Sequence, residues 1–162
     1  MAKKILDNIR LLKRDLSPIL ATLFGVGYVP LCPGTAACAV AVLIFILIKN
    51  PAYFVFFTLA SLFISFLVCG RAEKIFGKKD CKFIVIDDFS GMLITFLYIP
   101  WDIRYIICGF FLFRMLDMLK IPPANILERY PGSKGVVGDD LVAGVYANFI
   151  LHSVRLVLKI FS

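Results

Sequence analysis

Apolar stretches separated by short polar segments run through almost the whole chain. Five of them are evident, at residues 36–48, 52–69, 83–99, 103–119 and 141–158. A helix needs about 20 residues to cross the hydrocarbon core of a bilayer, so the shorter stretches would tilt, stop part-way or lie at the interface. Sustained strand alternation is missing, and helices satisfy their own backbone polar groups in lipid. The pattern therefore predicts an all-α transmembrane bundle with about four to five membrane segments.

The N-terminal part of the chain has a different pattern from the apolar stretches that follow. Residues 1–15 alternate apolar and charged side chains, which predicts an interfacial amphipathic helix over 1–20. The helical core is expected over 24–158, with a Pro- and Gly-rich loop at 121–138. The length suits a single domain covering 1–162.

Composition supports a membrane location. Hydrophobic residues make up 60% of the chain and the mean hydropathy is +0.90, whereas soluble domains are about 45–50% apolar. Lys and Arg number 18 against 11 Asp and Glu, which gives a net charge of +7. These basic residues flank the apolar stretches and do not alternate with aromatic residues in a stripe. Anionic lipid headgroups are therefore the expected partners, and nucleic acid is not.

Basic residues also indicate how the helices are oriented. The N-terminal segment and the segments 71–82 and 120–134 are rich in Lys and Arg, so the positive-inside rule places them in the cytoplasm. Arg155 and Lys159 fit less well, because five full crossings would place them outside. Either the last helix does not cross fully or another segment is re-entrant, and the sequence leaves both open.

Several known kinds of site can be excluded. Five cysteines without a Cys-x-x-Cys pair argue against a disulfide framework and against a zinc site. Cys108 and Arg114 have the Cys-x5-Arg spacing of cysteine phosphatases, but the residues between them are typical of a membrane helix. Asp-x-Asp, Walker and Gly-x-Gly-x-x-Gly motifs are absent. The only histidine, His152, lies deep in the last apolar stretch and is expected to pack between helices.

Four apolar stretches carry polar residues at one depth on the predicted cytoplasmic side. These residues are Gly34 and Thr35, Asp87 and Asp88, Arg114 and Asp117, and Asp139 and Asp140. An ionised group within a membrane segment costs at least about 2.5–3.5 kcal/mol, so such groups need partners, water or a function. Carboxylates from two helices form a hard-oxygen site that suits Mg²⁺, and adjacent Arg and Lys suit a phosphate. The simpler interpretations are a local Arg114–Asp117 pair and helix caps at the acidic doublets.

Three blocks are specific in their order and spacing. They are residues 24–35, residues 86–92, and residues 113–120 together with 138–144. These blocks resemble the phosphatidylglycerophosphatase A family of bacterial membrane enzymes. The resemblance implies a multi-pass protein of the bacterial inner membrane whose active site faces the cytoplasm. It implies a Mg²⁺-dependent phosphomonoesterase that converts phosphatidylglycerophosphate to phosphatidylglycerol in phospholipid biosynthesis.

The chain departs from the pattern of that family at three places. It has Asp88 where the family usually has Glu, Ile121 where Pro is usual, and Ser133 within a run that is often Gly-rich. The shorter carboxylate of Asp88 would draw a metal ligand back by about one methylene. These departures leave the substrate more open than the class of reaction.

Roles follow from the residues and the resemblance together. Metal ligands are expected among Asp87, Asp88, Asp139 and Asp140. Substrate-binding residues are expected to be Gly34, Thr35, Arg114, Lys120 and Lys134. Catalytic residues are expected to be Asp88, Arg114, Asp117, Asp139 and Asp140. The planar guanidinium of Arg114 would clamp the phosphate, and Asp117 would orient it.

Two other functions fit parts of the pattern. A small transporter would use the intramembrane charges as an ion path, and a non-catalytic protein would bind anionic lipid through its basic loops. A transporter needs polar residues along the whole depth, and the outer halves of these stretches are almost wholly apolar. The expected partners are therefore a phospholipid substrate and membrane lipids. A helix bundle of this size is also compatible with a homo-oligomer.

Overall fold

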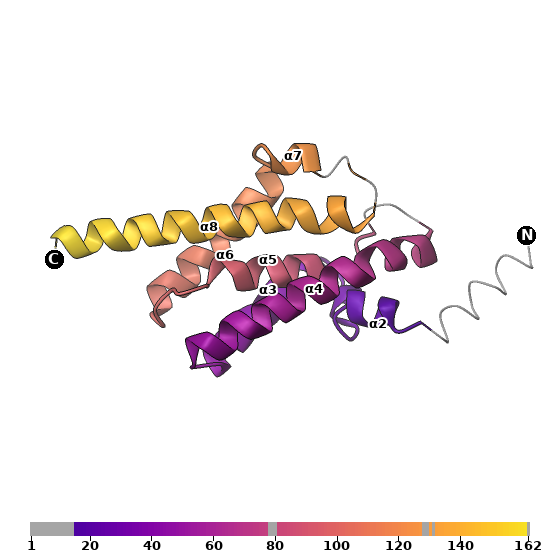
Figure 1. Ribbon diagram of the computed structural model, residues 1–162, viewed down its shortest axis with the longest axis horizontal. Coiled ribbons are helices and arrows are strands. Elements are labelled where there is room, and N and C mark those ends of the chain that lie inside the picture. The colour runs from indigo at the N-terminus through magenta and orange to yellow at the C-terminus, as the bar shows by residue number, and fades with distance from the viewer. Residues whose placement is uncertain (1–14, 78–80, 128–129, 131, 162) are drawn as a thin grey trace, which may run out of the picture.

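The computed structural model describes residues 15–77, 81–127, 130 and 132–161, and its regular elements are all helical (Figure 1). In chain order they are α2 (Ser17–Ala21), the 3-10 turn η1 (Val26–Tyr28), α3 (Pro33–Leu47), α4 (Pro51–Phe76), α5 (Ile86–Thr95), α6 (Ile103–Leu119), α7 (Ala124–Leu127) and α8 (Ser133–Phe161). The predicted all-α class is confirmed for the described residues.

Local sequence signals determine where the long helices begin and end. Pro33 and Pro51 lie in the first turn of α3 and α4, where a missing backbone N–H costs nothing. Asn50 and Asp102 cap α4 and α6, each accepting a 2.9 Å hydrogen bond from the backbone N–H two residues later. Gly77 follows α4 at a φ of 67°, a left-handed conformation that favours glycine.

Two regions differ from the sequence prediction. The apolar stretch 83–99 forms only the 10-residue helix α5, which is too short to cross a bilayer. The region predicted as a loop, 121–138, contains α7 and the first turn of α8. Asp139 and Asp140 consequently lie in the second turn of α8 and not at its start.

Two helices in the described part of the chain are long and apolar enough to cross a membrane. They are α4 and the segment Ser133–Ile160 of α8. α3 is apolar but has only 15 residues. Length and composition therefore support two crossing helices, with shorter helices beside them. Of the interfacial segment predicted over 1–20, residues 1–14 lie outside the described residues.

α5 lies in the middle of the bundle, with α8 on one side and α3 and α4 on the other (Figure 1). Its Met92 side chain is fully buried, and Phe96 just beyond it stacks on Phe45 of α3 with ring centroids 4.8 Å apart. Gly91 of α5 and Gly144 of α8 bring the two backbones into direct contact, since a Cβ on Gly144 would lie 3.2 Å from the Gly91 carbonyl carbon. This crossing places the first turn of α5 beside α8.

The C-terminal end of α5 is held by polar side chains of α8. The amide of Asn148 donates hydrogen bonds to the carbonyl oxygens of Thr95 (3.0 Å) and Leu97 (2.9 Å). His152 Nε2 lies 3.1 Å from the same Leu97 oxygen. These contacts satisfy carbonyl groups that a short helix leaves without an internal partner. They also account for the packing position that was expected for His152.

Candidate active site

A pocket of about 590 Å³ opens where the first turns of α3 and α5, the C-terminal half of α6 and the start of α8 meet. Its polar and charged lining residues are Thr35, Lys82, Asp87, Asp88, Arg114, Asp117, Lys120, Asp139 and Asp140. Four helices distant in sequence thus deliver their polar residues to one place. The structure brings together all the residues that were predicted to share one depth, whereas Lys134, expected to bind the substrate, does not line the pocket.

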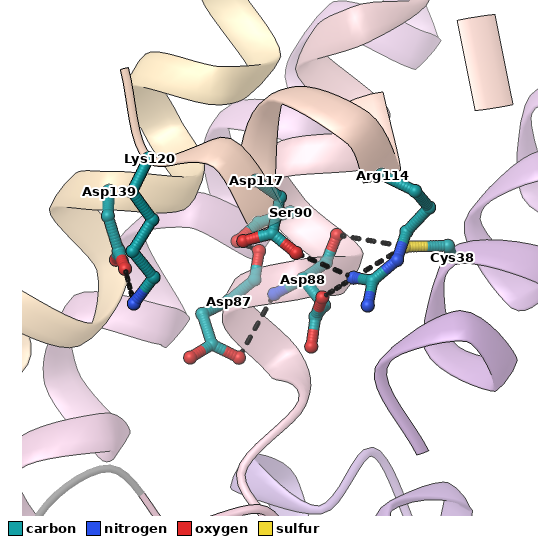
Figure 2. Close-up of polar contacts among 8 residues, drawn as sticks. All are labelled: Cys38, Asp87, Asp88, Ser90, Arg114, Asp117, Lys120 and Asp139. Carbon is teal, nitrogen blue, oxygen red and sulfur yellow. Dashed lines mark hydrogen bonds and ion pairs between the residues drawn. The ribbon is translucent and has the colours of Figure 1, made fainter. Parts of the chain in front are cut away.

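Arg114 of α6 is the centre of an ion-pair network (Figure 2). Its Nη1 atom pairs with Oδ1 of Asp88 on α5 and, at 2.9 Å, with Oδ2 of Asp117 one turn further along α6. The Cys38 sulfur of α3 lies 3.9 Å from the same nitrogen. A guanidinium held by two carboxylates is fixed in position while other N–H donors stay available. Asp117 would orient Arg114 through this contact, as its predicted role requires.

Three carboxylates form a compact acidic cluster. Asp87, Asp88 and Asp140 each place an oxygen within 4.8 Å of the others, with Asp87 and Asp140 almost fully buried. Asp87 Oδ1 also accepts a 3.0 Å hydrogen bond from the backbone N–H of Asp88. The cluster joins two helices, because the Gly91–Gly144 crossing places Asp140 beside the first turn of α5.

The acidic cluster fits a divalent cation. Five carboxylates and three basic side chains line the pocket, so an ionised pocket would carry an excess of two negative charges. Like charges buried together repel strongly unless a cation compensates them. Oxygen-only donors of this kind are the ligands that Mg²⁺ prefers in proteins. Asp87, Asp88 and Asp140 would hold such an ion.

The two acidic doublets behave differently. Both carboxylates of α5 join the acidic cluster, whereas in α8 only Asp140 does. Asp139 Oδ2 pairs with Lys120 Nζ at 3.4 Å, as Figure 2 shows, and its buried Oδ1 has no hydrogen-bond partner among the described residues. Adjacent residues of a helix point about 100° apart, which explains how the α8 doublet divides.

Gly34 in the first turn of α3 allows the Asp88 carboxylate to approach that helix. A Cβ at this position would lie 2.8 Å from Asp88 Oδ1, closer than real contacts allow. Thr35 follows it in the pocket lining. Lys134, by contrast, is exposed on the first turn of α8 and does not line the pocket.

Some pocket residues were missed by sequence reasoning. Lys82 lines the pocket, and its place in a run of basic residues hid it. Phe110 and Phe111 form an apolar wall one turn before Arg114 on α6, and that helical spacing was a usable signal.

Beneath the pocket, the Ser65 and Ser90 hydroxyls both contact the Ile86 carbonyl, at 3.1 and 2.8 Å. This contact fixes α5 against α4.

Comparisons with known proteins identify the family. The family model for phosphatidylglycerophosphatase A matches residues 19–155. A provisionally named phosphatidylinositol-3-phosphatase of Bacteroides thetaiotaomicron is 32% identical over 88% of this chain and 96% of its own length. The phosphatidylglycerophosphatase A of Escherichia coli is 33% identical over 83% of this chain and 80% of its own, and that of Haemophilus influenzae is 30% identical over 86% and 90%.

No solved structure matches the chain. The family assignment therefore rests on sequence, and it agrees with the resemblance carried by the three blocks around the pocket. Because the family model covers most of its length, the chain belongs to the phosphatidylglycerophosphatase A family and is a phospholipid phosphatase.

Proposed function

We propose that the chain is a Mg²⁺-dependent membrane phosphomonoesterase that converts phosphatidylglycerophosphate to phosphatidylglycerol and inorganic phosphate. One observation carries the proposal: an acidic cluster suited to a divalent ion lies beside an arginine held by two carboxylates, within one pocket. A phosphate monoester needs both kinds of group, because its charge grows on oxygens that cations and N–H donors can bind.

The surface of the helices supports placement in a membrane. Large apolar side chains on both long helices are exposed, among them Phe56 (74%) and Phe63 (65%) on α4 and Phe149 (71%) on α8. A soluble monomer rarely exposes so many, and lipid would cover them. Lys82 and Lys120, which belong to the basic segments predicted as cytoplasmic, line the pocket, so the positive-inside rule favours a pocket that faces the cytoplasm. In this proposal the protein is a multi-pass protein of the bacterial inner membrane.

The residues of the chain have separable roles in the proposed reaction. Asp87, Asp88 and Asp140 would hold Mg²⁺, which when bound stabilises negative charge on the phosphoryl oxygens. Arg114 binds the phosphate through the N–H groups that Asp88 and Asp117 leave available.

The remaining charged groups of the pocket complete the proposed site. Lys120, paired with Asp139, and Lys82 attract the anionic headgroup into the pocket. Asp139 is thereby held at the edge of the acidic cluster. Lys134, on the exposed surface of α8, would act only on the approach of the headgroup.

A second candidate substrate comes from one of the relatives. The Bacteroides protein named above carries the name of a phosphatidylinositol-3-phosphatase. Its suggested substrate is also a phosphate monoester on a phospholipid headgroup, so the same acidic cluster and Arg114 would serve it. The two candidates differ only in the alcohol that leaves, and a direct comparison of the two lipids separates them.

The test measures phosphate release by purified protein in mixed micelles. Phosphatidylglycerophosphate and phosphatidylinositol 3-phosphate are supplied separately, each with Mg²⁺ and with EDTA. Release from the first lipid alone, dependent on Mg²⁺, is the expected result. Release from the inositol lipid alone would replace the substrate. No release from any lipid phosphate would contradict the enzyme proposal in favour of a transporter or a lipid-binding protein.

A pair of variants ties the activity to the pocket. Asp88→Asn should abolish release, because Asp88 belongs to the acidic cluster and to the Arg114 network. Asp102→Asn is the matched control: Asp102, the N-cap of α6, pairs with Arg104 in the first turn of that helix, and hydrogen bonds from Arg104 lower the pKa of its carboxyl group. Equal activity of the two variants would place the chemistry elsewhere.

A further inference from the structure

A shallow apolar groove continues the pocket along the surface of the bundle. It lies between α3 and α6, encloses about 200 Å³, and is lined by Ala39, Val42, Ile106, Ile107, Phe110 and Phe111. The last two of these residues also line the charged pocket. The pocket and the groove therefore share a wall and form one continuous surface.

Each helix changes from polar to apolar along the face that lines this surface. On α3, Thr35 lies in the pocket and Ala39 and Val42 follow it at i+4 and i+7, which puts them on the same face. On α6, Ile107 and Phe110 lie seven and four residues before Arg114, again on its face. The groove thus extends about 10 Å from the phosphate-binding groups, at 1.5 Å per residue.

A phospholipid has the same order of polar and apolar parts. Its phosphate headgroup is charged, and its acyl chains begin within about that distance. The groove is open on its outer side, since Ile107 is 50% and Phe111 67% exposed. An acyl chain could enter it sideways from the bilayer while the headgroup stays at the membrane surface.

Resting on the proposed function, we propose that the α3–α6 groove binds an acyl chain of the substrate and so selects membrane lipids over water-soluble phosphate esters. The charge distribution favours this occupant. Six uncharged residues line the groove, and it leads directly to the arginine and lysine side chains of the pocket. A lipid phosphate is complementary to both parts at once.

A second groove on α6 provides the matched control. It lies between α6 and α8, is lined in part by Cys108 and Val154, and shares only Phe111 with the charged pocket. Its charged residues Arg104, Arg155 and Lys159 lie at the end away from the pocket. Cys108 follows Ile107 directly, so it has nearly the same depth but faces another side of α6. Ala39 and Cys108 are both small and exposed, so tryptophan at either position should preserve the fold.

The test compares Ala39→Trp and Cys108→Trp with the unmodified protein. Binding is measured with two non-hydrolysable phosphonate analogues of the substrate, one with 16-carbon acyl chains and one with the headgroup alone. Turnover of long-chain and soluble phosphate esters is measured in parallel. Ala39→Trp should weaken long-chain binding at least tenfold, raise KM for the long-chain lipid, and leave headgroup binding within twofold. Cys108→Trp should change neither.

The possible results separate the groove from the proposed function. Unchanged long-chain binding in Ala39→Trp would overturn the proposal, as would equal losses for both analogues. A loss confined to Cys108→Trp would also overturn it and assign the acyl chain to the α6–α8 groove. If Ala39→Trp weakens long-chain binding but the unmodified protein hydrolyses no lipid, the acyl-chain proposal is supported and the proposed function is contradicted.

Discussion

The two ends of α5 meet α8 in opposite ways. At the C-terminal end, Asn148 and His152 of α8 contact carbonyl oxygens at 2.9–3.1 Å, so donors meet acceptors. At the N-terminal end, Asp140 of α8 faces Asp87 and Asp88, so acceptors meet acceptors. A single helix of 10 residues thus connects a network of paired donors and acceptors to one that a cation would complete. Buried polar groups that satisfy one another stabilise a fold, and groups that do not are candidates for binding a ligand.

The comparison also shows why a short helix suits this site. A full-length crossing helix would carry its first turn to the membrane surface. α5 begins inside the bundle, so its first-turn carboxylates lie next to α6 and α8 and not in open solvent. Because α5 ends after few turns, carbonyl groups at its C-terminal end lack partners within the helix. Polar side chains of α8 form hydrogen bonds with them.

The largest expected effect comes from removing a carboxylate of the acidic cluster at the N-terminal end of α5. Asp140→Asn keeps the size of the side chain but removes one charge from the acidic cluster. We expect turnover to fall by at least about 10³-fold, because stabilisation of the phosphoryl oxygens is lost. Circular dichroism in detergent should be unchanged. Turnover near the unmodified level would remove Asp140 from the site.

The arginine beside the acidic cluster should be nearly as sensitive. Arg114→Lys keeps the charge, but a single ammonium cannot reproduce the planar fork between Asp88 and Asp117. We expect kcat to fall by about 10–100-fold. Steady-state kinetics with the long-chain lipid measure this change. A loss confined to KM would indicate that Arg114 only attracts the headgroup.

The crossing that links the two ends can be disturbed directly. Gly144→Ala would force the added Cβ against the Gly91 carbonyl group and push α5 away from α8. We expect a loss of about 1–3 kcal/mol in the free energy of unfolding, together with reduced turnover. Gly138→Ala is the milder comparison, since its Cβ would meet the Cβ of Leu127 at 3.3 Å and no backbone carbonyl group. Thermal unfolding in detergent compares the two.

A change at the C-terminal end of α5, where Asn148 and His152 bind carbonyl oxygens, should reduce stability without reducing kcat. Asn148→Ala leaves the Thr95 and Leu97 carbonyl groups without this donor. We expect a loss of about 1–2 kcal/mol in the free energy of unfolding, and unchanged kcat per folded molecule. Unfolding midpoints and active-fraction-corrected turnover test both parts. A large fall in kcat would show that the two ends are coupled.

The smallest effect is expected at the exposed lysine. Lys134→Ala should change kcat/KM by less than about twofold, because an exposed charge outside the pocket is screened by salt. Lys120→Ala is the comparison, since Lys120 lines the pocket and pairs with Asp139. We expect its KM to rise by about 3–10-fold. Equal effects of the two changes would extend the substrate site to the first turn of α8.

Sequence reasoning predicted the residues of the site more reliably than their grouping. The polar residues of four apolar stretches were expected at one depth, and they all line one pocket, whereas Lys134, expected to bind the substrate, lies outside it. Metal ligands were expected among all four carboxylates of the two Asp pairs, and the structure groups Asp87, Asp88 and Asp140 but not Asp139. In α5 the Asp87 carboxylate turns back to the Asp88 N–H, and this places both side chains in the acidic cluster. That local hydrogen bond has no signature in the sequence.

The ends of α6 were predicted from the sequence, but the ends of α5 were not. The ends of α6 match the predicted stretch 103–119, because Asp102 caps one end and the polar Lys120 follows the other. α5 is much shorter than the apolar stretch that contains it, because non-helical segments on both sides also bury apolar residues, Ile84 and Val85 before the helix and Phe96 and Ile99 after it. Hydrophobicity reports burial in lipid or protein alike, so it does not reveal where a helix stops.

The amino-acid sequence by itself determined the helical class, the polar residues available and their common depth, because these follow from periodicity, from breaks and from the cost of charge in lipid. Only the tertiary structure decided which carboxylates share a site. The rotation and closeness of α5 and α8 are set by backbone contact at Gly91 and Gly144, a property of two surfaces packed together. A residue's partners across helices depend on that packing, which no single segment encodes.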